Sequence, residues 1–366
     1  MLEIKATETL KEESIFGQIT KMDHEQLVIC HDEATGLKAL IGIHNTVLGP
    51  ALGGTRMWPY ATEQEAITDV LRLSRGMTFK NALAGLNLGG GKAVIIGDPK
   101  LKNEAFVRRF GRFVENLGGR YVTAEDMNMK PSDMEYIAME TRHVAGLPEI
   151  KGGAGDPSPV TAFGVYMGMK AAAKKAFGSD SLTGKKIGVQ GVGQVGKYLI
   201  EYLIKEGAEV MVTDIFEEKL MEIAKTTGAQ AVDPNVIYDL PMDIYSPNAL
   251  GATINDETID RLKCAVIAGG ANNQLKDEDK HGALLVKKGI IYAPDFLINA
   301  GGVINVGMEY LGGYNRNLVF QQTEKIYDTC TTIFEKSDRD NITVQQAAIK
   351  TAMARIESIG RVKMSF

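Results

Sequence analysis

The sequence has few of the features that mark secreted, membrane or metal-binding proteins. Its 366 residues include only three cysteines, Cys30, Cys264 and Cys330, which lie far apart. A small, odd number of distant cysteines forms no disulfide framework and no metal motif, and it fits a reducing compartment. No stretch approaches the ~20 apolar residues of a membrane helix, and the N-terminus lacks the apolar core of a secretory signal. We therefore expect a cytoplasmic protein without a metal site.

Strong charge of one sign is also missing. The formal net charge is -5 and no basic run occurs, so neither nucleic acid nor a membrane surface is an expected partner. Hydrophobic residues make up 44% and charged residues 24% of the chain, the balance of a folded globular protein. The length suits two domains. The histidines show no metal spacing and are expected to be structural or on the surface, namely His24, His31, His44, His143 and His281.

The first part of the chain mixes strand and helix patterns. The run ALIGIHNTVLG at 39–49 is rich in apolar and β-branched residues and predicts a strand. Thr62 followed by Glu65 indicates a capping box that begins a helix reaching about Arg75. Four apolar side chains recur at helical spacing and predict a buried helix face, namely Phe106, Phe110, Phe113 and Leu117.

A segment rich in Gly and Pro at 151–159, KGGAGDPSP, indicates a domain boundary. After it, helical segments alternate with short apolar runs that are typical of parallel strands buried on both faces. This alternation predicts a Rossmann-type, doubly wound α/β domain. We expect one domain at 1–147 together with the C-terminal helix at 345–366, and a second at 148–344, with a cleft between them. The predicted strands lie at 186–190, 209–213, 243–246, 264–268 and 290–293.

A glycine motif in the second part indicates a dinucleotide site. Gly191, Gly193 and Gly196 form the G-x-G-x-x-G pattern directly after an apolar strand and at the start of a helix. In such a motif the glycines permit a tight turn, let a pyrophosphate approach the backbone closely and let the helix pack against the strand. The N-terminus of the helix then binds the phosphates. The next strand ends at Asp214, 18 residues after Gly196, where a carboxylate accepts bonds from ribose hydroxyls and repels a 2′-phosphate. The motif therefore predicts NAD rather than NADP.

A second glycine-rich segment, GMTFKNALAGLNLGGGKAVIIGDP at 76–99, contains two lysines, Lys80 and Lys92. It is not a nucleotide-binding P-loop, because Leu86 and Ala93 occupy the positions where that motif needs Gly and Ser or Thr. Two lysine side chains brought together repel each other, so the pKa of at least one should fall. A neutral lysine is a useful general base, and a charged lysine can bind a carboxylate. From the spacing alone, two surface lysines on unrelated elements are an equally good interpretation.

Six ordered blocks complete the pattern, and through them the chain resembles the glutamate/leucine/phenylalanine/valine dehydrogenase family over about residues 20–360. The likeness is greatest to its leucine-specific members. It implies an α/β substrate-binding and oligomerisation domain followed by an NAD-binding domain. The blocks are LGPALGGTRMW (48–58), GMTFKNALAGLNLGGGK (76–92), RYVTAED (120–126), PSPVTAFGV (157–165), IAGGANNQL (267–275) and INAGGVINV (298–306).

The resemblance also implies roles for single residues. Lys80 binds the substrate carboxylate with the backbone of Gly53 and Gly54, Lys92 is the catalytic base, and Asp126 relays protons. The nicotinamide ring is held by Thr161, Asn272 and Asn299. Uncharged residues form the side-chain pocket, namely Leu52, Ala124, Val303 and Val306.

An uncharged pocket predicts an aliphatic substrate, since burying a second carboxylate unpaired is costly. The implied function is reversible NAD-dependent oxidative deamination of leucine, isoleucine and valine by a homo-oligomer, an octamer in the family. Alternatives are a phenylalanine or broad-range enzyme and a non-catalytic NAD-binding sensor. The chain departs from the leucine-specific pattern at 127–129, where Met-Asn-Met replaces Val-Gly-Thr, at Gly270 in place of Ser and at Asp156 in place of Asn.

Overall fold

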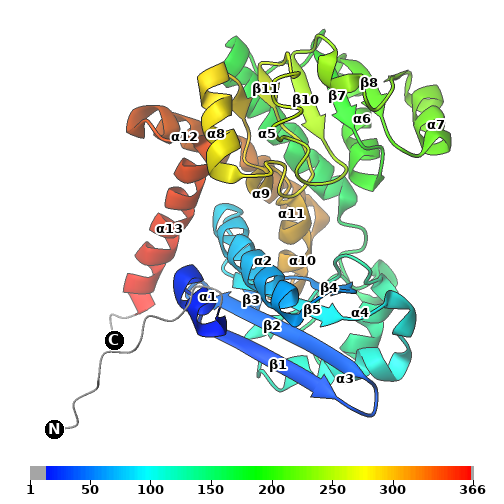
Figure 1. Cartoon of the computed structure of the whole chain (residues 1–366), viewed down its shortest axis with the longest axis vertical. Coiled ribbons are helices and arrows are strands. Elements are labelled where there is room, and N and C mark those ends of the chain that lie inside the picture. The colour runs from blue at the N-terminus through cyan, green and yellow to red at the C-terminus, as the bar shows by residue number, and fades with distance from the viewer. Residues whose placement is uncertain (1–13, 364–366) are drawn as a thin grey trace.

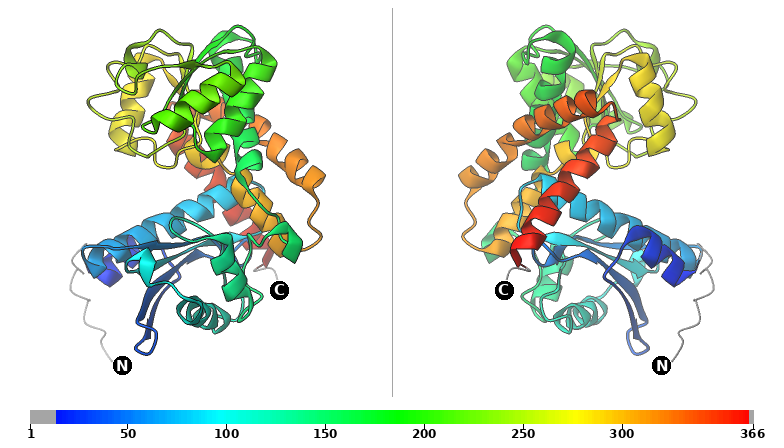
Figure 2. Two further views of the ribbon diagram at one scale, coloured as in Figure 1. Left: turned by 90° about the vertical axis from the view of Figure 1, so that its right-hand side faces the viewer. Right: turned by 90° about the vertical axis from the view of Figure 1, so that its left-hand side faces the viewer.

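Two domains with a sheet each make up the chain (Figure 1). The computed structural model describes residues 14–363. Residues 1–13 and 364–366, which belong to the predicted first domain, lie outside the described residues. The two sheets lie in separate lobes, and helices from the last part of the chain run from one lobe to the other (Figure 2). This arrangement agrees with the predicted α/β architecture of two domains.

The first sheet has six strands in the order β1-β2-β5-β3-β6, with β4 paired to β5. β1 and β2 form an antiparallel hairpin and β2 is antiparallel to β5, whereas β3 and β4 run parallel to β5. The strand predicted at 39–49 is β2, which ends earlier because the chain turns after Asn45. The strands are β1 (Gln26–Asp32), β2 (Leu37–Asn45), β3 (Ala51–Leu52), β4 (Thr55–Trp58), β5 (Gly89–Ile96) and β6 (Tyr121–Val122).

Helices cover both faces of this sheet. α1 (Ile15–Met22) and α2 (Glu63–Leu83) lie on one face, and α3 (Glu104–Glu115) and α4 (Pro131–Ala138) lie on the other. Thr62 caps α2 by accepting a hydrogen bond from the backbone of Glu65, as predicted. The predicted end near Arg75 is wrong, because α2 continues through Gly76 to Leu83 with its last two turns buried against β5. Packing there outweighs the weak helix propensity of glycine.

The second sheet is entirely parallel, in the order β12-β11-β10-β7-β8-β9. The chain moves outward from β7 in both directions, which is the doubly wound topology with its switch point between β7 and β10. Every strand predicted in this part of the chain is present within two residues of the expected bounds. The strands are β7 (Lys186–Gln190), β8 (Glu209–Thr213), β9 (Gln230–Ala231), β10 (Ile244–Pro247), β11 (Val266–Ile267) and β12 (Ile291–Tyr292).

Helices cover this sheet and connect it to the first domain. α10 (Gly301–Leu311) reaches the first domain, where the hydroxyl of Tyr310 lies 3.1 Å from His143 Nδ1. α13 (Val344–Lys363) packs on both α12 and α2. None of the helices between residues 14 and 363 is long and apolar enough to cross a bilayer. The others are α5 (Ser158–Phe177), α6 (Gln194–Glu206), α7 (Glu217–Thr227), α8 (Glu278–Lys288), α9 (Asp295–Ile298), α11 (Arg316–Glu324) and α12 (Ile326–Asp340).

A pair of histidines is buried beneath α2. The rings of His24 and His44 meet edge to face with centroids 4.7 Å apart. His24 Nε2 lies 2.8 Å from Ser74 Oγ, and His44 Nδ1 lies 2.7 Å from Thr78 Oγ1. Burial lowers the pKa of each ring to about 4. Both rings are therefore neutral near pH 7 and act as part of the packing, as expected for histidines without a metal pattern.

The neutral pair makes the stability of the fold depend on pH. Because the folded pKa values lie below the ordinary value of 6.5, the unfolded chain binds protons more readily. The free energy of unfolding should be greatest above about pH 6.5 and fall toward pH 4, by up to about 1.4 kcal/mol per pH unit for each ring. Urea unfolding between pH 4 and 7.5 measures this slope. His44→Gln should flatten it and His31→Gln, at an exposed position, should not; equal slopes in all three proteins would contradict the assignment.

Candidate active site

A cavity of about 400 Å³ lies between the two domains. It contains twelve of the residues predicted for the site, contributed by both domains. Residues separated by up to 254 positions in the sequence therefore line one space, as the predicted cleft requires. The twelve are Leu52, Gly53, Gly54, Lys80, Lys92, Ala124, Asp126, Thr161, Asn272, Asn299, Val303 and Val306.

Glycines at the start of β5 bring the two lysines together. A Cβ on Gly90 would lie 2.0 Å from Thr78 Oγ1 and 2.2 Å from the Thr78 backbone nitrogen. Only a residue without a side chain lets α2 approach β5 this closely. Lys80 is two residues beyond Thr78 on α2, and Lys92 is two residues beyond Gly90 on β5. The glycine run thus serves helix–strand packing rather than phosphate binding.

Lys92 forms an ion pair with Asp126 in the cavity. Its Nζ lies 2.7 Å from Asp126 Oδ2, and the same oxygen accepts a hydrogen bond from Arg56 Nε at 3.1 Å. Burial alone would raise the pKa of Asp126, but the two cations outweigh burial and lower it to about 2. The carboxylate is therefore ionised across the physiological range and holds the Lys92 ammonium in place.

Lys80 reaches across to the second domain. Its Nζ donates a hydrogen bond to Asn272 Oδ1 at 3.3 Å. Burial lowers the pKa of Lys80 to about 8, and the charge of Lys92 adds to the effect, while Asp295 and Asp126 oppose it. The prediction that the pKa of one lysine falls is confirmed, and the lowered value belongs to Lys80. The main cause is burial, and among the described residues no carboxylate lies within ion-pair distance of Lys80 Nζ.

The glycine turn of the second domain adjoins this cavity. Gly191 has a φ of +103°, and its N–H donates to the carbonyl of Thr213 at the end of β8. A Cβ on Gly196 would lie 2.1 Å from the Gly191 carbonyl oxygen, so α6 packs tightly on the turn. Gly193, at the N-cap of α6, faces open space. Asp214 accepts a hydrogen bond from the Val192 backbone at 2.8 Å.

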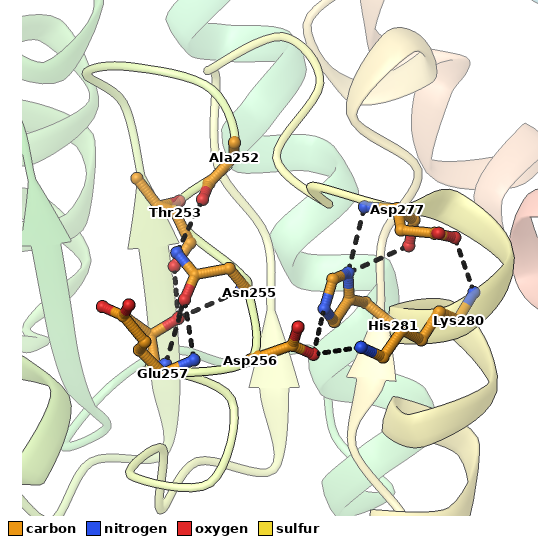
Figure 3. Close-up of polar contacts among 9 residues, drawn as sticks. Ala252, Thr253, Asn255, Asp256, Glu257, Asp277, Lys280 and His281 are labelled. Atoms are coloured by element: carbon orange, nitrogen blue, oxygen red, sulfur yellow. Dashed lines mark hydrogen bonds and ion pairs between the residues drawn. The ribbon is translucent and has the colours of Figure 1, made fainter.

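The loop that carries Asn272 is hydrogen-bonded to an extended segment at residues 252–254. The N–H groups of Ala252 and Ile254 donate to the carbonyls of Asn273 and Gln274 at 2.7 and 3.0 Å. Beyond that segment, Asp256 Oδ1 contacts His281 Nε2 and Lys280 Nζ at the start of α8 (Figure 3). These bonds fix the backbone on which Asn272 sits.

Asn299 completes the polar wall of the cavity. Its Nδ2 donates to Asn272 Oδ1 at 2.7 Å and to the carbonyl of Gly270 at 3.2 Å. Its Oδ1 is buried and has no hydrogen-bond partner among residues 14–363. A buried carbonyl oxygen without a donor is unfavourable, so this atom suits a ligand that supplies an N–H group.

Four of the residues that line the cavity form an apolar set, the apolar wall. Leu52 ends β3 and Ala124 follows β6, and Val303 and Val306 come from the first turns of α10. All four are at most 9% exposed and none carries charge. This wall has room for an aliphatic side chain and offers nothing to pair with a buried carboxylate.

Family models match both domains of the chain. Residues 24–143 match the model described as Glu/Leu/Phe/Val dehydrogenase, dimerisation domain, and residues 152–216 and 212–362 match the Glutamate/Leucine/Phenylalanine/Valine dehydrogenase model. The chain belongs to this family. It is accordingly an amino-acid dehydrogenase, as the sequence blocks predicted.

Individual relatives cover nearly the whole chain. The leucine dehydrogenase of Thermoactinomyces intermedius is 57% identical over 96% of this chain and 96% of its own. The leucine dehydrogenase of Bacillus cereus is 56% identical over 94% of each. The crystal structure of L-tryptophan dehydrogenase from Nostoc punctiforme superposes with a TM-score of 0.84 at 43% identity, covering 94% of this chain and 99% of that one.

The departures from the leucine-specific members of the family have visible structural settings. Asn128, where a glycine is usual, has a φ of +61°, a conformation that asparagine tolerates better than other side chains. A Cβ on Gly270 would lie 2.9 Å from Asn248 Oδ1 and 3.0 Å from Val195. Asp156 is exposed and accepts a hydrogen bond from the Ser158 backbone, and its charge adds to burial in raising the pKa of Glu125.

Glu309 was not anticipated from the sequence. Its carboxylate accepts hydrogen bonds from the backbone of Gly146, Leu147 and Ala154 at 2.9–3.2 Å. These three residues lie in the connection between the two domains, and Glu309 lies on α10 beyond Val306. The carboxylate therefore ties that connection to the helix that forms the apolar wall. The one available signal was a single charged residue in a mostly apolar helix.

Removing this carboxylate should loosen the connection. Glu309→Ala leaves three backbone donors without their acceptor, which should lower the free energy of unfolding by about 1–3 kcal/mol. Urea unfolding followed by circular dichroism measures the change. Glu324→Ala, at an exposed position on the neighbouring α11, is the matched control and should stay within about 0.5 kcal/mol of the unchanged protein. Equal stability of the two variants would show that Glu309 has no such role.

Proposed function

We propose that this chain catalyses the reversible, NAD-dependent oxidative deamination of branched-chain L-amino acids, leucine and also isoleucine and valine, to 2-oxo acids and ammonia. The observation that carries the proposal is the convergence of Lys80, Lys92 and Asp126 on one cavity that is also lined by Leu52, Ala124, Val303 and Val306. The identity of 56–57% to leucine dehydrogenases over most of both chains supports the same substrate class.

The turn after β7 suits a dinucleotide. Gly193 leaves open space at the N-terminus of α6, where free N–H groups and the helix dipole favour a pyrophosphate. Asp214 would bind the ribose hydroxyls and disfavour a 2′-phosphate. Thr161, Asn272 and Asn299 would hold the nicotinamide, and the unpartnered Oδ1 of Asn299 suits a carboxamide N–H. When bound, NAD supplies the acceptor for the hydride of the substrate Cα.

Lys80 is the carboxylate anchor in this proposal. With a pKa of about 8 it is charged at neutral pH, and an incoming carboxylate stabilises that charge further. The backbone around Gly53 and Gly54 lines the cavity beside it. Holding the carboxylate at this end fixes the substrate Cα and directs its side chain toward Val303 and Val306.

Lys92 and Asp126 perform the proton transfers. In this proposal Lys92 enters the chemical step as the neutral amine, having given its ammonium proton to solvent before hydride transfer. The neutral amine then takes a proton from the water that attacks the imino carbon. Asp126, 2.7 Å from Lys92 Nζ, accepts and returns protons as the amino group departs as ammonia. In the reverse direction the paired ammonium is already in the state that delivers a proton.

A panel of substrates tests the proposal. Absorbance at 340 nm should rise with leucine, isoleucine or valine and NAD, and much less with phenylalanine, glutamate or NADP. Faster turnover of phenylalanine would favour the aromatic or broad-range alternative. No NADH from any amino acid, together with measurable binding of NAD, would leave a non-catalytic sensor.

Replacing Lys92 should abolish turnover without unfolding the protein. Loss of a positioned base in Lys92→Ala should lower kcat by about 10²–10⁴-fold. Initial rates with leucine measure this. Lys102→Ala is a matched control, because the Lys102 side chain is buried to a similar extent and forms an ion pair with Asp133 that lies outside the cavity. Turnover should survive in the control; a Lys92 variant as active as the control would refute the role.

Replacing Lys80 should chiefly weaken binding of the carboxylate. Lys80→Met loses charged hydrogen bonds worth about 1.5–3 kcal/mol, a rise of about tenfold or more in KM. In the unchanged enzyme the charge of Lys80 is present below pH 8 and lost above it. The inhibition constant of 4-methylpentanoate, which has the leucine skeleton without its amino group, should therefore increase above about pH 8. Lys276→Met, at an exposed position, should leave both values unchanged; a pH-independent inhibition constant would contradict the anchor role.

The assembly is also a proposal. The first domain matches a model described as a dimerisation domain, and we infer a homo-oligomer, with eight subunits as the expected number. Light scattering on the purified protein measures the mass directly.

A further inference from the structure

A second cation, Arg56, contacts the carboxylate that Lys92 contacts. We propose that Arg56, held in turn by Asp69, is a positioning residue that fixes the Asp126 carboxylate for proton transfer. The inference rests on the proposed function of Asp126 and extends it to a residue outside the cavity. Arg56 does not line the cavity that holds the two lysines, so it acts on the reaction through Asp126 alone.

The guanidinium bridges two carboxylates on different elements. Arg56 projects from β4, its Nε donates to Asp126 Oδ2 at 3.1 Å, and its Nη1 donates to Asp69 Oδ2 on α2 at 3.1 Å. The hydroxyl of Tyr60 also donates to Asp69 Oδ2, at 2.5 Å. The Arg56 side chain is 19% exposed. Two directed bonds from a planar group define its orientation, which a single lysine ammonium would not do.

Two cations, Lys92 and Arg56, contact the Asp126 carboxylate. Lys92 on β5 and Arg56 on β4 both contact Oδ2, so the carboxylate is held from two directions. The other charged or titratable groups that act on this site are Lys80 on α2, Tyr121 on β6 and the adjacent Glu125. When Lys92 loses its proton during turnover, Arg56 is the cation that remains in contact. It thereby keeps the carboxylate in place at the step where its partner becomes neutral.

A purely structural role for Arg56 would be to tie β4 to α2. That role predicts lower stability but leaves the ionisation of Asp126 and the ratio of kcat to KM unchanged. A positioning role predicts that kcat falls while KM for leucine changes little, because Arg56 does not contact the substrate. It also predicts that the Asp126 carboxyl is protonated at higher pH when Arg56 is absent, since one of its two cations is lost.

The test uses Arg56→Gln, Arg56→Lys and Asp69→Asn in the full chain. Arg56→Gln should lower kcat by about tenfold to a hundredfold, the cost of a misplaced catalytic group, with KM within about twofold. Arg56→Lys should recover part of kcat, because it restores the charge but not the bridge, and Asp69→Asn should show a smaller loss than Arg56→Gln. The control is Arg109→Gln, which removes a more exposed ion pair with Asp32, Nε to Oδ1 at 2.8 Å, between residues that do not line the cavity. Its kcat and KM should equal those of the unchanged enzyme.

Titration of the Asp126 carboxyl by ¹³C NMR gives a readout that needs no turnover, with Asp126→Asn identifying the signal. In Arg56→Gln the Asp126 signal should begin to titrate at a pH where that of the unchanged enzyme, with its pKa of about 2, is still fully ionised, a change of about tenfold or more in the acid constant. Unchanged kcat and an unmoved midpoint would overturn the proposal. If Arg56→Gln does not fold, the other two variants decide the question. The proposal is then overturned if neither Arg56→Lys nor Asp69→Asn lowers kcat or shifts the titration of Asp126. If the unchanged enzyme reduces no NAD with any amino acid, the proposed function fails, and the titration still decides whether Arg56 governs Asp126.

Discussion

The close contact between α2 and β5 is the constraint on which the site depends. Gly90 meets Thr78 at a distance that no side chain permits, and the contact fixes the separation of the elements that carry Lys80 and Lys92. The same helix face covers the neutral His24–His44 pair, so α2 rests on packed, uncharged groups. A helix held this rigidly can keep two ammonium groups in one cavity despite their repulsion.

The charges of the cavity are arranged so that each lysine has a different environment. Lys92 is paired with a carboxylate that a second cation supports, whereas Lys80 donates to a neutral amide and has its pKa lowered by burial. A carboxylate ligand is therefore the group that Lys80 lacks. The buried Oδ1 of Asn299 is likewise short of a donor. Lys80 and Asn299 line the same cavity. A carboxylate would pair with the Lys80 ammonium, and an N–H group on a second ligand beside it would donate to Asn299 Oδ1.

Much of the fold could be predicted because buried parallel strands are plain apolar runs: the predicted strands at 186–190 and 209–213 coincide with β7 and β8. The residues of the cavity were found from ordered sequence blocks. The sequence could not reveal the end of α2, since Gly76 resembles a stop signal until packing is known. Nor could it reveal Arg56 and Glu309, because a single charged residue carries no information about its distant partner. The hydrogen-bond partner of Lys80, Asn272, likewise lies 192 positions away in the sequence.

A crystal structure of the enzyme with NADH and 4-methyl-2-oxopentanoate tests the central claim most directly. The account predicts the ligand carboxylate within hydrogen-bond distance of Lys80 Nζ, the 2-oxo carbon beside Lys92 Nζ, and the isobutyl group against Val303 and Val306. A ligand bound in the reverse orientation, with its carboxylate toward the valines, or bound outside this cavity, would contradict it.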